Sequence, residues 1–132
     1  SFRPTSPIRY QNTINKALKI FKNKAKKYSG LRSVNLMSET SFKTHRIVEK
    51  KLCALNKKDF NIEKYNLPRQ RYPETYESNG IIDIYKTKNI LSGFGLGNKV
   101  FPFIVNDINS DIDSLDDFEY IEYFIIKNKF KI

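Results

Sequence analysis

The sequence has a single cysteine and no run of apolar residues long enough to cross a membrane. Cys53 has no second cysteine to pair with, so an internal disulfide is excluded and a reducing cytoplasm is the expected compartment. Its apolar neighbours favour a position in the core over a role as nucleophile. A membrane helix needs about 20 apolar residues, and residues 1–30 lack the apolar segment of a signal peptide. We therefore expect a cytoplasmic protein without a membrane partner.

The sequence also lacks the common motifs of catalytic and nucleotide-binding sites. His45 is the only histidine, and nothing in the sequence indicates a Ser-His-Asp triad around it. The glycines of GFGLG, residues 93–97, match neither the dinucleotide-binding nor the Walker pattern, which favours an ordinary loop. An EF-hand loop starting at Asp107 would need glycine and glutamate at two positions where the chain has Ile112 and Phe118.

Basic residues far outnumber acidic ones, and the formal net charge is +10. Of the 24 basic residues, 18 are lysines spread over most of the chain. Such spreading is typical of a compositional bias, whereas nucleic-acid sites usually combine arginine and stacking aromatics in one patch. A positive field would also attract a phosphate-rich small substrate. A noncatalytic basic module that binds nucleic acid or another polyanion is the alternative function, with nucleic acid the less favoured partner.

The length of 132 residues and the hydrophobic fraction of 39% suit one domain with a true core. Helical and extended segments alternate along the chain, which predicts an α/β fold. Strands or hairpins are expected over residues 32–38, 41–55, 80–86 and 99–105, and a short helix over 87–93. Pro102 predicts that the last strand lies at an edge or contains a bulge. Residues 56–78 are polar and are predicted to form an extended loop or arm.

Two longer helices are predicted from apolar periodicity. The first has Asn12 or Thr13 as its cap and ends at 29–30. Its apolar stripe comprises Ile14, Ala17, Leu18, Phe21 and Ala25. The second begins at Ser114, which is expected to form a capping box with Asp117. Its apolar stripe comprises Leu115, Phe118, Ile121 and Ile125.

Acidic residues are concentrated near the end of the chain, where seven of the fourteen carboxylates lie between Asp107 and Glu122. Asp111 and Asp113 stand on either side of Ile112, just before the last predicted helix. Alternate side chains of an extended segment share one face, so the two carboxylates would repel unless a cation neutralised them. Mg²⁺ is commonly held by one or two carboxylates together with substrate phosphates and waters. The spacing leaves two interpretations open: a magnesium site, or aspartates that merely favour a helix N-terminus.

Four short segments, taken together and in order, resemble the acylneuraminate cytidylyltransferases, also called CMP-sialic acid synthetases. They are RPTSPIR (3–9), SFKTHRI (41–47), PRQRYPETYESNGIIDI (68–84) and SDIDSLDDFEYIE (110–122). Each match is short, but the shared order and spacing extend over nearly the whole chain. The resemblance implies a transferase that uses CTP and Mg²⁺ to make a CMP-sugar and pyrophosphate. Its substrate would be a nine-carbon or related sugar acid, such as those destined for cell-surface polysaccharide.

The resemblance also implies roles for individual residues. Asp111 and Asp113 would be the catalytic carboxylates, holding Mg²⁺ at the phosphates. The positions that match substrate-binding residues of the family are Arg3, Lys43, Arg69, Gln70, Asn79 and Asp83. Arg3 replaces the family's usual glutamine and Asp83 replaces a common tyrosine, so the resemblance does not fix the sugar as N-acetylneuraminate.

The resemblance covers the C-terminal portion of such an enzyme. It implies a Rossmann-like three-layer α/β sandwich of the nucleotide-diphospho-sugar transferase type, with a mixed sheet, of which residues 1–132 form a single partial domain. The family's glycine-rich CTP-binding loop has no counterpart in the sequence, so the chain alone is expected to be inactive. Residues 44–75 match an extended dimerisation arm, and a homodimer is expected.

Overall fold

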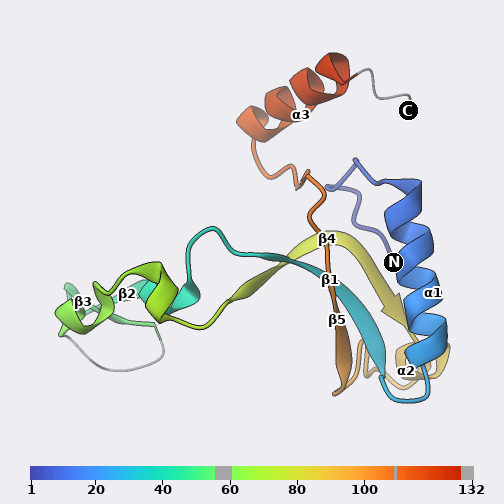
Figure 1. The fold of residues 1–132 in the computed structure, drawn as a ribbon, viewed down its shortest axis with the longest axis horizontal. Helices are drawn as coiled ribbons and strands as arrows, with labels where there is room; N and C mark the ends of the chain where they lie inside the picture. Colours follow the sequence, from blue (N-terminus) through green and yellow to red (C-terminus); the bar gives the residue numbers. More distant parts are fainter. Residues whose placement is uncertain (56–60, 109, 129–132) are drawn as a thin grey trace. The chain divides into compact units, whose positions relative to one another are not determined.

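The computed structural model describes residues 1–55, 61–108 and 110–128. Within them the chain forms a small α/β fold with three α-helices, a mixed three-stranded sheet and a two-stranded hairpin (Figure 1). The α/β class predicted from the alternation of elements is therefore confirmed. The chain divides into two compact units, which we call the first unit (Ser1–Asn35 with Ser78–Ile132) and the second unit (Leu36–Glu77).

The first unit contains the mixed sheet, whose strand order is β4–β1–β5. The central strand β1 (Gly30–Leu36) pairs in parallel with β5 (Val100–Ile104), and β4 (Tyr76–Tyr85) forms the opposite edge. Pro102 thus lies in an edge strand, as predicted. Proline has no N–H to donate, and an edge strand tolerates this loss.

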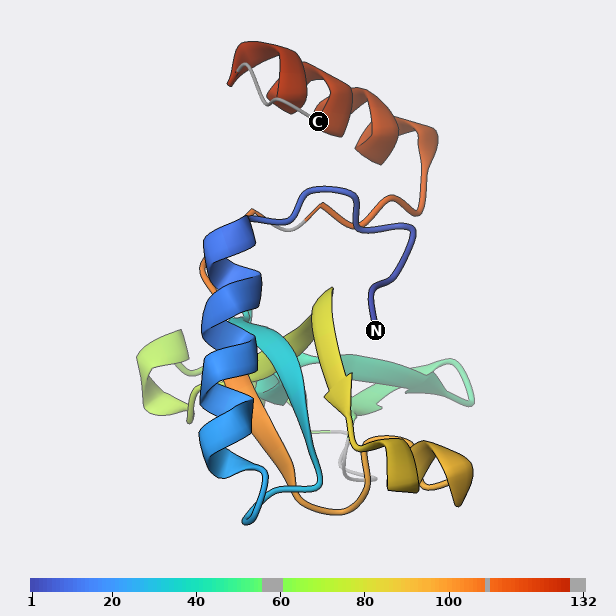
Figure 2. The ribbon, with the colours of Figure 1, turned by 90° about the vertical axis from the view of Figure 1, so that its right-hand side faces the viewer.

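Helix α1 (Gln11–Lys24) lies along one face of this sheet (Figure 2). Ala17 and Phe21 bury the sheet-facing side of the helix. The core that they join consists of Leu31, Ile81, Ile82, Phe103 and Val105. Leu18, predicted for the same apolar stripe, is 50% exposed. The apolar stripe of α1 is therefore wider than the sheet face that covers it.

The start of α1 differs from the prediction. Tyr10 is the cap, in an extended conformation, and no side chain caps the helix. The hydroxyl of Thr13 instead donates to a carboxylate oxygen of Asp107 at 2.6 Å. Thr13, which was predicted as a possible cap, thus forms a long-range hydrogen bond. This bond attaches the first turn of α1 to the segment that follows β5.

Helix α2 (Thr87–Leu91) follows β4 at the position where a short helix was predicted. The loop after it contains Gly93, Gly95 and Gly97, all with positive φ, the backbone region that glycine adopts most readily. The GFGLG segment therefore forms a loop, as predicted, and this loop leads into β5. In the described part of the chain, no helix has the length and apolarity needed to cross a membrane.

Helix α3 (Leu115–Lys127) begins with the predicted capping box. The Ser114 hydroxyl accepts from the Asp117 N–H at 3.2 Å, and the Asp117 carboxylate accepts from the Ser114 N–H at 2.9 Å. The predicted apolar stripe is only partly buried: Ile121 is buried, whereas Leu115 and Phe118 are exposed.

The second unit contains the hairpin of β2 (His45–Val48) and β3 (Lys51–Ala54), which pair antiparallel as predicted. Glu49 and Lys50, both with positive φ, form the turn between the two strands. Three short 3₁₀ helices, η1 (Ser41–Lys43), η2 (Ile62–Tyr65) and η3 (Arg69–Arg71), complete the unit. The predicted loop over 56–78 therefore contains two short helical turns and the start of β4, while 56–60 lies outside the described residues. The residue range of the second unit, Leu36–Glu77, includes the segment 44–75 that was expected to be a dimerisation arm.

Candidate functional site

Two segments from opposite ends of the chain lie side by side in the first unit. The Ser6 hydroxyl donates to a carboxylate oxygen of Asp111 at 3.2 Å. The Ile112 N–H donates to the Thr5 carbonyl at 2.9 Å, and the Ile8 N–H donates to the Ser110 hydroxyl at 3.2 Å. Segment 3–9 thereby fixes the backbone that carries the two predicted catalytic aspartates.

A buried polar pair supports the middle of this site. The Ser33 hydroxyl on β1 donates to the Asn79 side-chain carbonyl on β4 at 2.6 Å. The same hydroxyl accepts from the Ile82 N–H at 2.9 Å, so it joins the two strands. Asn79 is only 2% exposed, and among the described residues its side-chain NH₂ group has no hydrogen-bond partner. A buried donor without a partner is uncommon in folded proteins.

Gly80 brings strand β4 against segment 3–9. Its φ is +68°, and a Cβ atom built there would lie 2.6 Å from the Ser6 hydroxyl oxygen and 3.1 Å from Cδ of Arg3. Only glycine combines this backbone conformation with so close an approach. Asn79 and Gly80 thus place the end of one resembling segment against another.

Arg9 holds segment 3–9 in place. Its Nε donates to the Ile81 carbonyl at 3.0 Å, its Nη2 donates to the Arg3 carbonyl, and its guanidinium carbon lies 5.0 Å from the centre of the Phe2 ring. Partial burial lowers the pKa of Arg9 from its usual value. The Arg3 side chain is exposed beside this clamp, which leaves it accessible to a ligand.

Asp111 and Asp113 differ in their surroundings. Asp111 is half-buried and accepts the one hydrogen bond from Ser6, whereas Asp113 is exposed. Within the described residues, no group of three or more His, Cys, Asp or Glu side chains could hold a metal ion. Asp111 and Asp113 alone are too few ligands for Mg²⁺. They fit a Mg²⁺ ion whose other ligands are substrate phosphates and waters.

Asp83 is engaged by an ion pair. Arg32 on β1 donates to both carboxylate oxygens, at 3.0 and 2.8 Å, and the Tyr85 hydroxyl donates to one of them at 3.3 Å. The hydrogen bonds to Asp83 raise the pKa of Arg32 above its usual value. A bidentate pair of this kind neutralises the Asp83 charge locally. Asp83, which the resemblance assigns to substrate binding, is therefore bonded to Arg32 on β1.

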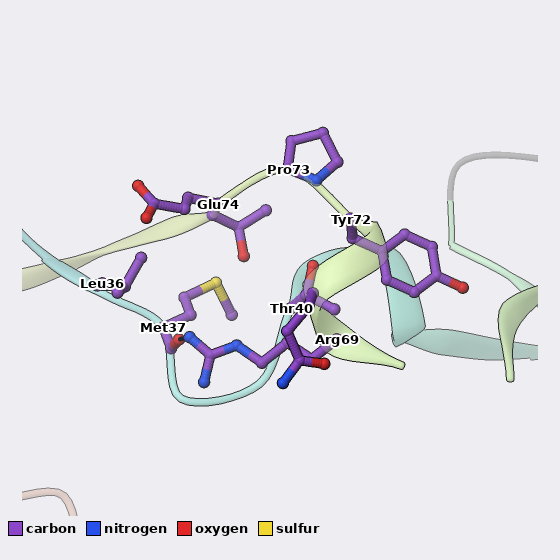
Figure 3. Close-up of a pocket in the computed structure, with 9 residues that line it drawn as sticks. Leu36, Met37, Thr40, Arg69, Tyr72, Pro73 and Glu74 are labelled. Carbon is purple, nitrogen blue, oxygen red and sulfur yellow. Dashed lines mark hydrogen bonds between the residues drawn. The ribbon is translucent and has the colours of Figure 1, made fainter. Parts of the chain in front are cut away.

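The other three predicted substrate-binding residues belong to the second unit. Arg69 and Gln70 line a cavity of about 350 Å³ together with Met37, Thr40 and Tyr72 (Figure 3). Nη2 of Arg69 donates to the Met37 carbonyl at 2.7 Å. Lys43 is half-buried and closes η1, the helix that Thr40 caps. The cavity thus combines the Arg69 guanidinium, the Gln70 amide and the Tyr72 ring with the carboxylate of Glu74 (Figure 3).

The structure separates the predicted site residues into two groups. Arg3, Asn79, Asp83, Asp111 and Asp113 belong to the first unit, and Lys43, Arg69 and Gln70 to the second. Sequence reasoning missed Ser6, Ser33 and Arg9, the residues that connect the first group. Ser6 and Arg9 stand inside RPTSPIR, but serine and arginine in a short motif give no signal of the strand or carboxylate that they will contact.

A scan against protein-family models and a search of curated proteins find no match to this chain. The assignment of function consequently depends on the residues and their arrangement.

Proposed function

We propose that the chain is the metal- and sugar-binding portion of a nucleotidyltransferase that resembles the acylneuraminate cytidylyltransferases. In this proposal the complete enzyme is cytoplasmic, transfers CMP from CTP to a sialic-acid-like sugar acid, and releases pyrophosphate. The three-stranded sheet and α1 would then be part of a Rossmann-like three-layer sandwich. The nucleotide would require a binding loop that residues 1–132 do not contain.

The proposal is supported by the convergence, in the first unit, of two of the resembling segments and the end of a third. Segment 3–9 bonds to residues 110–112, and Gly80 of the third segment lies against Ser6 and Arg3. Segments that resemble a family by chance have no reason to meet in the fold. Their meeting around Asp111 is the geometric relationship that a shared site requires.

The proposed division of labour follows from the chemistry of the residues. Asp111 and Asp113 would hold Mg²⁺, which would supply charge neutralisation to the phosphates of the nucleotide. Ser6 positions Asp111 through its hydrogen bond, and the buried Asn79 would hold the neighbouring part of β4 in place through its bond to Ser33. Arg3 is a cationic group available to the substrate at the same place.

Within the second unit, the cavity beside Arg69 would be a binding place for a carboxylate group. Arginine binds a carboxylate through two parallel hydrogen bonds, and Arg69 has donors beyond the one that it gives to Met37. In the proposed homodimer this unit is the dimerisation arm. Its largely exposed apolar side chains, such as Ile47 at 77%, suit a segment that packs on a second subunit.

A titration with Mn²⁺, a paramagnetic stand-in for Mg²⁺, tests the metal site in the chain itself. With pyrophosphate present, we expect the amide NMR signals of Ser6 and of residues 111–114 to broaden first. Asp111→Asn and Asp113→Asn should each abolish this selective broadening. Asp116→Asn is the matched control, because it removes the same charge from an exposed position on α3 and should leave the broadening intact.

Activity is tested after joining the chain to the nucleotide-binding segment of a family member. Pyrophosphate release from CTP with a sugar acid should fall about a hundredfold or more in Asp111→Asn, a loss typical of removing a transition-state charge stabiliser. Selective broadening without any activity would retain the metal site and reject the cytidylyltransferase assignment. Uniform broadening in wild type and both variants would reject the metal site.

A further inference from the structure

The C-terminus of α1 and the α2 loop meet at one end of the first unit. The Ser29 N–H donates to the Lys99 carbonyl at 2.7 Å, and the Lys99 N–H donates back to the Ser29 hydroxyl at 3.0 Å. The Asn89 side-chain NH₂ donates to the Ser29 carbonyl at 3.1 Å. These bonds make one continuous surface from two segments that are about sixty residues apart in the sequence. Figure 2 shows this end at the bottom, with α3 at the opposite end of the unit.

Three large apolar side chains project from this end within five residues. Ile90 is 58% exposed, Leu91 is 84% exposed and Phe94 is 66% exposed. We call these three residues the α2 tip. Single exposed apolar residues are common on protein surfaces, but a cluster on one short projecting segment is typical of an interaction site. The proposed transferase chemistry does not use any of the three.

The two segments that meet at this end carry several lysines, and Asp83, which lines an apolar groove together with Ile90, is the carboxylate near them. The exposed lysines of the two segments are Lys24, Lys26, Lys27, Lys88 and Lys99. No acidic residue occurs in residues 1–38 or 84–106, so neither segment carries a countercharge. The nearest carboxylate in sequence, Asp83, is paired with Arg32. The remaining carboxylates of the first unit lie in residues 107–122, which lead into and form α3 at the opposite end.

Two aromatic rings hold part of this basic surface together. Tyr28 and Phe101 meet edge to face with centroids 5.1 Å apart. The ammonium group of Lys24 lies 5.1 Å from the Phe101 centroid, and that of Lys99 lies 5.9 Å from the Tyr28 centroid. Both lysines are therefore held against this aromatic pair by cation–π contacts.

We propose that this end of the first unit docks on the surface of a membrane that contains anionic lipids. The α2 tip would enter the boundary between headgroups and acyl chains, and the lysines would contact lipid phosphates. Ile90 and Leu91 favour a lipid surface over a nucleic acid, because aliphatic side chains gain nothing from a phosphate backbone but gain from hydrocarbon. The inference differs from the sequence-based expectation of no membrane partner. It concerns reversible surface binding and requires no spanning helix.

Vesicle binding by variants tests this inference. Sedimentation is measured with phosphatidylcholine vesicles and with vesicles that contain about one third phosphatidylserine, a strongly anionic surface. We expect binding to the anionic vesicles only, weakened by salt. The double variant Leu91→Ser/Phe94→Ser should bind at least about tenfold more weakly, and Lys88→Gln about fivefold more weakly. Matched controls are Leu115→Ser and Lys127→Gln on α3, which should bind like wild type.

The absence of tryptophan from the chain gives a second readout. In Phe94→Trp, the new fluorophore should shift to shorter wavelength when anionic vesicles are added, and it should not shift with a single-stranded oligonucleotide. The inference is overturned if anionic vesicles do not bind at low salt. It is equally overturned if Leu91→Ser/Phe94→Ser, shown by circular dichroism to be folded, binds as tightly as wild type, since charge alone would then explain the attraction.

Discussion

Gly80 is where the backbone of β4 passes closest to the candidate site. Its positive φ disfavours any other residue, and its hydrogen faces the Ser6 hydroxyl that bonds Asp111. Asn79 and Ser33 lie next to it and connect β4 to β1. A small change here should therefore affect both stability and the position of the proposed metal-binding segment.

We expect Gly80→Ala to lower the free energy of unfolding by about 2–3 kcal/mol, from left-handed strain and from displacement of Ser6. Urea denaturation gives this value. Gly95→Ala is the matched control: its φ is also positive, but a Cβ atom there meets nothing within 4 Å. It should cost only the backbone strain, about 1–2 kcal/mol. Equal losses in both variants would show that the approach of Ser6 does not contribute.

At the scale of one element, α3 shows how a local signal is satisfied. The capping box could be predicted from the sequence because the residues that form it lie within four positions of one another. Hydrogen bonds from the Ser114 hydroxyl and from backbone N–H groups lower the pKa of Asp117 below its usual value. A carboxyl whose pKa falls on folding stabilises the helix above its unfolded-state pKa. That contribution is lost as the pH falls through its folded-state pKa.

We therefore predict that the amide signals of the first turn of α3 change when acid protonates Asp117. An NMR titration of the side-chain carboxyl should give Asp117 a pKa below the usual value for an aspartate. Ser114→Ala should move the Asp117 pKa towards its usual value and loosen the first turn at neutral pH. An unchanged Asp117 pKa in Ser114→Ala would exclude the hydroxyl as the cause.

At the scale of the whole chain, the sequence predicts local elements better than long-range ones. The hairpin, α2 and the edge position of Pro102 follow from patterns within a few residues. The stripes of α1 and α3 were predicted too wide, because periodicity reveals an apolar side but not how much of it a neighbour covers. The bond from Ser6 to Asp111 spans 105 positions, and no local rule predicts such a partner. The resemblance implied a substrate-binding role for Arg3 and a metal-binding role for Asp111, but it did not say which atoms join their two segments.

The two units also differ in how they are stabilised. The first unit has a core of seven buried residues drawn from α1, the three strands and Val105. In the described part of the second unit, the buried apolar residues are Cys53 and Ala54. Elements with few buried apolar contacts open at a lower free energy than the core. The second unit should therefore depend on something outside itself, and the proposed homodimer would provide it.

Hydrogen exchange of backbone amides at several protein concentrations tests this dependence. In dilute protein, the ladder amides of β2 and β3 should exchange much faster than those of β1 and β5. As the concentration rises, exchange in the hairpin should slow. Association of two subunits through this unit stabilises its folded state by mass action. Exchange in β1 and β5, which the core of the first unit protects, should not change and serves as the internal reference. Hairpin exchange that is independent of concentration would contradict the assignment of 44–75 as a dimerisation arm.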